Sequence, residues 1–127
     1  MEQITKIAVV GSRSFEDYTL FEKVMETYLS EFDNVAFVSG GAKGADALAQ
    51  RYAEENGVEM IVFKPEWSRY GRGAGYVRNK QIWQEADRGI AFWDGKSKGT
   101  QHSFKLAHEL EKPLQVYDYV KKAFVSV

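Results

Sequence analysis

The chain has 127 residues, of which 44% are hydrophobic and 14% aromatic, which suits one domain with one core and excludes a disordered segment. It has no cysteine and only two histidines, so disulfides and thiolate zinc sites are excluded and most imidazole metal sites are disfavoured. The net charge of −1 argues against a protein whose whole surface attracts nucleic acid. We expect a single domain over residues 1–127 with no bound metal and no cofactor.

Membrane insertion and export are not indicated by the sequence. Residues 1–6 are polar, and no basic segment followed by a long apolar stretch precedes the first apolar run. No apolar run is long enough to span a bilayer. We therefore expect a cytoplasmic protein that does not bind membranes.

The first half of the chain alternates predicted strands with predicted helices. The apolar run 7–10 ends at a glycine and predicts a strand that is buried on both faces. A helix is predicted over 17–30 and a second strand at 35–38. A second helix is predicted over 45–55, with Gly57 as its stop signal.

The second half continues the same alternation. We expect, in order, a strand at 58–63 that ends before Pro65, a loop rich in glycine and arginine at 66–75, a helix at 76–86, a strand at 90–93, a helix at 100–110 and a strand at 114–117. The residues after 117 are compatible with an edge extension of the sheet or with a short terminal helix.

This alternation predicts an α/β fold, a Rossmann-like three-layer sandwich with a five-stranded, mainly parallel sheet. The expected strand order is 3-2-1-4-5. In such a sheet the first and fourth strands lie side by side at the topological switch point, where ligands bind. The loops after strands one, two and four would then meet at one edge.

Those three loops hold most of the glycines. They are the short loop 11–14 after the first strand, the loop 39–46 after the second and the loop 94–100 after the fourth. Glycines allow the backbone to approach a phosphate closely, and the N–H groups at a helix start point toward such an anion. We therefore predict a phosphate-bearing small molecule as the ligand, either a nucleotide or a nucleotide derivative.

The predicted ligand-binding residues come from these loops and from the third predicted helix. They are Gly11, Ser12, Arg13, Gly40, Gly41, Ala42, Lys43, Gly44, Asp46, Arg78, Asn79, Asp94, Gly95, Gly99 and Thr100. Some of them have a structural alternative. Asp46 is equally compatible with an acidic residue that stabilises a helix start, Asn79 and Thr100 with helix caps, and Asp94 with closure of a turn.

Aromatic residues add a second type of ligand contact. Trp67 and Tyr70 are candidates for stacking on a base, whereas core packing is the simpler interpretation of Trp93.

Two common phosphate-binding motifs are absent. A Walker A loop that ended at Gly95-Lys96-Ser97 would need a glycine where Ile90 stands, inside a predicted strand. The segment 71–75 begins like a dinucleotide fingerprint, but Tyr76 occupies the last glycine position. An ATPase and an ordinary NAD enzyme are therefore disfavoured.

The motifs that remain resemble a known group in their order along the chain. Gly11-Ser12-Arg13, the segment 40–46, Trp67, the segment 74–79 and the segment 94–100 stand as they do in the SLOG superfamily, in particular its YspA/YpsA-related branch. The resemblance covers about residues 5–117. It implies a Rossmann-like domain that binds nucleotides, nucleotide-derived signals or nucleic acid, in a group that includes DprA and the Lonely Guy phosphoribohydrolases.

The sequence departs from the enzymatic branch of that group. The phosphoribohydrolases resemble Pro-Gly-Gly-x-Gly-Thr followed closely by a catalytic Glu, whereas the first acidic residue after Thr100 is Glu109. We assign no catalytic residue and expect a nucleotide-binding or nucleotide-sensing domain. A nucleotide N-glycosidase and a single-stranded DNA binder are the alternatives; the net charge disfavours nucleic acid as a partner, and self-association stays open.

Overall fold

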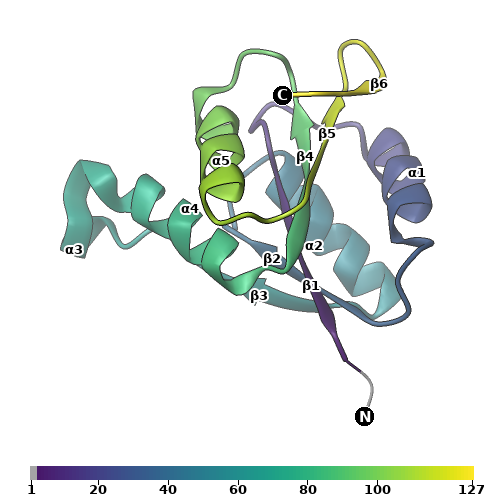
Figure 1. Ribbon diagram of the computed structural model, residues 1–127, viewed down its shortest axis with the longest axis horizontal. Helices are drawn as coiled ribbons and strands as arrows, with labels where there is room; N and C mark the ends of the chain where they lie inside the picture. Colours follow the sequence, from purple (N-terminus) through teal and green to yellow (C-terminus); the bar gives the residue numbers. More distant parts are fainter. Residues whose placement is uncertain (1–2) are drawn as a thin grey trace.

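The computed structural model describes residues 3–127, which form a six-stranded sheet between two layers of helices (Figure 1). In chain order the elements are β1 (Thr5–Gly11), α1 (Tyr18–Leu29), β2 (Val35–Ser39), α2 (Ala45–Asn56), β3 (Glu59–Val62), α3 (Trp67–Tyr70), η1 (Gly71–Gly73), α4 (Ala74–Glu85), β4 (Arg88–Trp93), α5 (Lys98–Glu109), β5 (Leu114–Asp118) and β6 (Ala123–Val125). The predicted alternation of strands and helices is confirmed.

The strand order is β3-β2-β1-β4-β5-β6, and β1 to β5 run parallel to one another. The order predicted for the first five strands is confirmed, but the expectation of five strands was wrong. A sixth strand, β6, pairs antiparallel with β5. The Asp118 carboxylate accepts the N–H groups of Val120 and Lys121, both at 2.9 Å, and these bonds stabilise the turn that brings the chain back. The chain therefore ends in an edge extension and not in a terminal helix.

The segment predicted as a loop at 66–75 is partly helical. It contains the short helix α3 and the 3₁₀ turn η1, and α4 begins at residue 74 and not at 76. The side chain of Ala74 is fully buried, so the first turn of α4 is anchored against the rest of the domain. Figure 1 shows α3 at the far end of α4, away from the sheet.

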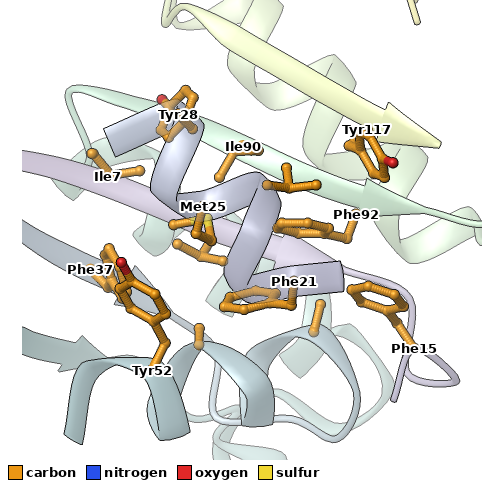
Figure 2. Close-up of a cluster of buried hydrophobic side chains, with 14 of the residues drawn as sticks. Ile7, Phe15, Phe21, Met25, Tyr28, Phe37, Tyr52, Ile90, Phe92 and Tyr117 are labelled. Carbon is orange, nitrogen blue, oxygen red and sulfur yellow. The ribbon is translucent and has the colours of Figure 1, made fainter. Parts of the chain in front are cut away.

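Two clusters of buried side chains cover the two faces of the sheet. On one face α1 and α2 pack over the central strands, with Phe21 and Met25 of α1 against Ile7, Ile90 and Phe92 (Figure 2). On the other face α4 and α5 bury a second cluster, which includes Ile82, Trp83, Leu106 and Ala107. Because both faces are covered, the central strands are apolar without alternation.

This topology determines where a ligand site can form. The strands β1 and β4 are adjacent, while the connection after β1 leads toward β2 and the connection after β4 leads toward β5. The chain therefore leaves the two strands in opposite directions, as expected of a topological switch point. Within residues 3–127 no helix is long and apolar enough to cross a membrane.

Candidate functional site

A cleft of about 460 Å³ lies at the carboxyl ends of β1 and β4. Ten of the predicted ligand-binding residues line it: Gly11, Ser12, Arg13, Ala42, Asp46, Arg78, Asn79, Asp94, Gly99 and Thr100. The loops after β1, β2 and β4 all contribute to this list, as does the first half of α4. The expectation that three loops meet at one edge of the sheet is therefore confirmed.

The other five predicted residues do not line the cleft: Gly40, Gly41, Lys43, Gly44 and Gly95. Two of these glycines are needed for contacts within the chain. A Cβ at Gly44, whose φ is +73°, would lie 2.3 Å from the backbone oxygen of Ser12. A Cβ at Gly40 would lie 2.3 Å from Nη1 of Arg78. These two glycines therefore allow the site to assemble, and direct contact between them and a ligand stays a prediction.

The carboxylate of Asp46 lies in the first turn of α2 and is buried. Its Oδ2 accepts the backbone N–H of Ala42 at 3.1 Å. Burial raises the pKa of Asp46, although the N–H groups of Ala42 and Gly40 and the charge of Arg78 oppose the rise. The acidic group beside the N-terminus of α2 is therefore the chain's own Asp46.

Arg78 extends from α4 into the wall of the cleft and is buried. Its Nη1 donates to the backbone oxygen of Gly40 at 2.9 Å, and its Nε donates to Oδ1 of Asn79 at 2.9 Å. Burial lowers the pKa of Arg78; the Asp46 carboxylate opposes this effect, and the neighbouring Arg13 adds to it. The guanidinium has five N–H donors, so these two bonds hold it in place and leave donor capacity for a ligand.

The loop after β4 is organised around Asp94. Its Oδ1 accepts the N–H groups of Lys96 at 2.8 Å and Ser97 at 2.7 Å, and its own N–H donates to Oγ of Ser12 at 3.2 Å. Burial would raise the pKa of Asp94, but these N–H groups outweigh it and the pKa is lowered. Asp94 therefore closes the turn, the structural alternative that the sequence left open.

The cap of α5 differs from the prediction. Thr100 was a predicted helix cap, but the N-cap is Ser97, whose Oγ accepts the N–H of Thr100 at 3.4 Å. Thr100 Oγ1 donates to the same oxygen at 3.0 Å. The helix begins earlier than predicted because the turn closed by Asp94 brings Ser97 to its start. Thr100 is consequently buried inside the first turn, where it lines the cleft.

Asn79 connects α4 with α5. Its Nδ2 lies 3.2 Å from Nδ1 of His102, and its Oδ1 accepts from Arg78. The alternative of a helix cap at Asn79 was wrong, because α4 starts at Ala74 and places Asn79 inside the helix. The Tyr76 ring packs edge-on against the His102 ring with centroids 4.7 Å apart.

Sequence reasoning missed five residues that line the cleft: Val10, Ser14, Ile82, Ser97 and Ser103. Ser97 carries a recognisable signal, because serine is a preferred N-cap and it stands directly before the first helical residue. Ser103 follows Thr100 by three positions, a spacing that puts both side chains on one face of a helix. The other three residues carry no local signal of this kind: Val10 and Ser14 on β1 and its loop, and Ile82 on α4.

A parallel sheet with a ligand-sized cleft at its switch point defines a Rossmann-like α/β domain. The chain belongs to the YspA, cpYpsA-related SLOG family, whose model matches residues 5–70. The Gene 61 protein of Mycobacterium phage D29 is 32% identical over 117 residues, an alignment that covers 86% of this chain and 93% of the phage protein. The resemblance stated from the sequence is therefore confirmed.

The fold is shared with a solved structure of DNA processing protein A from Helicobacter pylori, a protein with a single-stranded DNA binding mode. The two chains are 24% identical, with a TM-score of 0.68. The match covers 89% of this chain and 65% of the Helicobacter chain, so it spans somewhat less than two thirds of that protein. At this identity the similarity shows the fold.

Proposed function

We propose that the cleft binds the phosphate of a nucleotide or nucleotide derivative. The observation that carries this proposal is the convergence of Arg13, Arg78 and the N-terminal turn of α5 on one cleft of about 460 Å³. Guanidinium groups bind phosphate through paired N–H donors, and a helix start adds further N–H groups and a positive dipole end. The volume lies in the range of small-molecule sites, about 300–1,000 Å³.

The phosphate is proposed to lie at α5 and not at α2. Asp46 already places a carboxylate at the start of α2, where it accepts the N–H of Ala42. The N–H of Ala42 is therefore already bonded within the chain. The first turn of α5 contains no acidic residue, and the Asp94 carboxylate just before it is bonded to the N–H groups of Lys96 and Ser97. Arg13 and Arg78 are near enough to influence each other electrostatically, so they form a paired cationic surface.

The rest of the cleft suits a sugar and a base. Thr100 and Ser103 contribute hydroxyl groups, and Val10 and Ile82 contribute apolar surface. A ribose offers hydroxyls that pair with such groups, and a base offers a flat apolar face. This combination supports a nucleotide more than inorganic phosphate alone.

Calorimetric titration with nucleoside mono- and diphosphates tests the proposal. The variant Arg78→Gln should weaken binding by about tenfold to a hundredfold, because a charge-assisted hydrogen bond is lost. Arg51→Gln is the matched control, since Arg51 lies exposed on α2 and pairs with Glu55 outside the cleft. Equal affinities for the wild type and Arg78→Gln would refute the proposed phosphate site.

A nucleotide N-glycosidase is the second candidate, and one observation favours it. Asp46 lines the cleft and burial raises its pKa, which suits a group that transfers a proton. Glu109 is a poor substitute, because it is the last residue of α5 and is exposed. Release of free base from nucleoside monophosphates, measured chromatographically and lost in Asp46→Asn, would establish the hydrolase. Absence of release from wild-type protein that binds the nucleotides supports the binding function.

A further inference from the structure

Residues 64–80 form a surface that the cleft does not explain, and we name it the basic arm. It comprises the end of the β3–α3 connection, α3, η1 and the first half of α4. Three aromatic side chains of the arm are exposed: Trp67 at 55%, Tyr70 at 37% and Tyr76 at 62% of their surface. Large aromatic side chains are usually buried, because burial of their apolar surface stabilises the fold. Three exposed rings in one short segment therefore indicate a surface that binds a partner.

The arm is also basic. It contains five basic residues, Lys64, Arg69, Arg72, Arg78 and Lys80, against the single acidic residue Glu66. Its net charge is therefore +4, whereas the whole chain has a net charge of −1. The charge of the chain is unevenly distributed, and the arm is a local site of attraction for polyanions.

Packing within the chain accounts for only part of the composition of the arm, because the Tyr76 ring contacts His102 on one side and is still 62% exposed. A Cβ at Gly73 or at Gly75 would meet nothing within 4 Å, so neither glycine is required by a close internal contact. The guanidinium of Arg69 lies 5.1 Å from the centre of the Tyr70 ring, and its ion pair with Glu66 is long, at 3.8 Å, and exposed. Figure 1 shows α3 extending beyond the helices that cover the sheet. Of the basic residues of the arm, Lys64, Arg69, Arg72 and Lys80 are exposed to solvent, whereas Arg78 is buried in the wall of the cleft.

We propose that the basic arm binds single-stranded nucleic acid, with its rings stacking on bases and its cations contacting phosphates. Aromatic side chains interleaved with basic residues are the chemistry that recognises unpaired bases on a phosphate backbone. This inference rests on the proposed function in one respect, because Arg78 belongs both to the arm and to the cleft. One phosphate of the strand occupies the cleft, and the following nucleotides lie along α3 and the start of α4.

The basic arm should distinguish single-stranded from double-stranded nucleic acid. Stacking needs base faces that are unpaired, and a duplex hides them, so the arm should prefer a single strand over a duplex of the same length. Stacking and phosphate contacts would accept either DNA or RNA, and comparing dT12 with rU12 shows which of the two binds more tightly.

Fluorescence anisotropy with labelled dT12, rU12 and a 12-base-pair duplex tests the arm. The double variant Trp67→Ala/Tyr76→Ala should weaken binding of the better single strand by about tenfold or more, since each stacked base is stabilised substantially by its ring. Val120→Ala is the control, because Val120 is an exposed apolar residue of the turn between β5 and β6, outside the arm. Both changes concern exposed side chains, and circular dichroism should show an unchanged fold.

The salt dependence of oligonucleotide affinity separates the contribution of stacking from that of charge. Arg72→Gln should reduce the slope of log affinity against log salt by about 0.7, the value for one phosphate contact on a single strand. The double aromatic variant should lower affinity at every salt concentration and leave the slope unchanged. A salt slope that changes in the aromatic variant would overturn the stacking role.

The outcomes distinguish the arm from the cleft. Unchanged affinity in the double aromatic variant, a duplex bound as tightly as a single strand, or no binding of dT12 and rU12 would each overturn the arm proposal, even if mononucleotides bind. Oligonucleotide binding that depends on Trp67 and Tyr76, without any binding of mononucleotides, would support the arm and refute the mononucleotide site.

Discussion

The guanidinium of Arg78 occupies the space that a side chain at residue 40 would need. Its Nη1 donates to the Gly40 backbone oxygen at 2.9 Å, and a Cβ on Gly40 would lie 2.3 Å from the same nitrogen. The absence of a side chain in the loop after β2 therefore allows a cation from α4 to reach the cleft. In the sequence Gly40 suggests a backbone that approaches a phosphate, whereas in the structure it makes room for the guanidinium of Arg78.

Gly40→Ala tests this relationship. The added methyl group should displace Arg78 and lower the free energy of unfolding by about 1–3 kcal/mol, the usual cost of overpacking a well-packed site. Nucleotide affinity should fall as well, because the displaced guanidinium no longer faces the ligand. Chemical denaturation and calorimetric titration measure the two effects. Full nucleotide affinity in Gly40→Ala would show that the position of Arg78 is not critical.

Gly44→Ala should be more harmful than Gly99→Ala. Gly44 has φ of +73°, and its Cβ would meet the Ser12 backbone oxygen at 2.3 Å, so the variant should lose at least about 2 kcal/mol of stability. A Cβ on Gly99, which lies in α5, would meet nothing within 4 Å. Gly99→Ala should therefore be neutral or gain up to about 1 kcal/mol. Thermal unfolding of the pair tests the difference, and equal melting temperatures would contradict it.

The stability of the protein should depend on the ionisation of Asp46. Burial raises its pKa above the ordinary value of 3.8, so the folded protein retains the proton at pH values where the unfolded chain has lost it. The stability that this proton confers is complete below the ordinary value and is lost as the pH rises through the raised value. The variant Asp46→Asn should no longer lose this stability as the pH rises. Denaturation curves from about pH 4 to pH 7 compare the two proteins; parallel pH profiles would argue against a raised pKa.

Loss of the α5 cap should be measurable. Ser97 Oγ accepts from both the N–H and the hydroxyl of Thr100, so Ser97→Ala should cost about 1 kcal/mol of unfolding free energy. Ser126→Ala provides the control, because Ser126 is exposed and follows the last strand. Urea denaturation is the measurement. A change in Ser97→Ala no larger than in the control would mean that another group replaces the cap.

Much of the fold follows from local patterns in the sequence. Buried apolar runs predicted five strands and their order, and glycine-rich loops predicted which edge of the sheet holds the cleft. These predictions succeed because periodicity and turn chemistry are properties of residues that are close together in the chain. The sixth strand was missed because it is three residues long and depends on the turn made by Asp118 and on the contact between Tyr117 and Phe124.

The arrangement within the site was decided by contacts between distant residues. Arg78 reaches Gly40 across 38 positions, and Asp94 reaches Ser12 across 82. The sequence placed Asp46 at a helix start and left open whether it contacts a ligand; the structure shows that its carboxyl group accepts the N–H of Ala42 and also lines the cleft.

The net charge of the chain likewise does not describe its local charge. A sum over the chain is independent of position, whereas binding depends on the local field. The basic residues of 64–80 are visible in the sequence, but only the structure shows that Arg78 is buried while Lys64, Arg69, Arg72 and Lys80 are exposed.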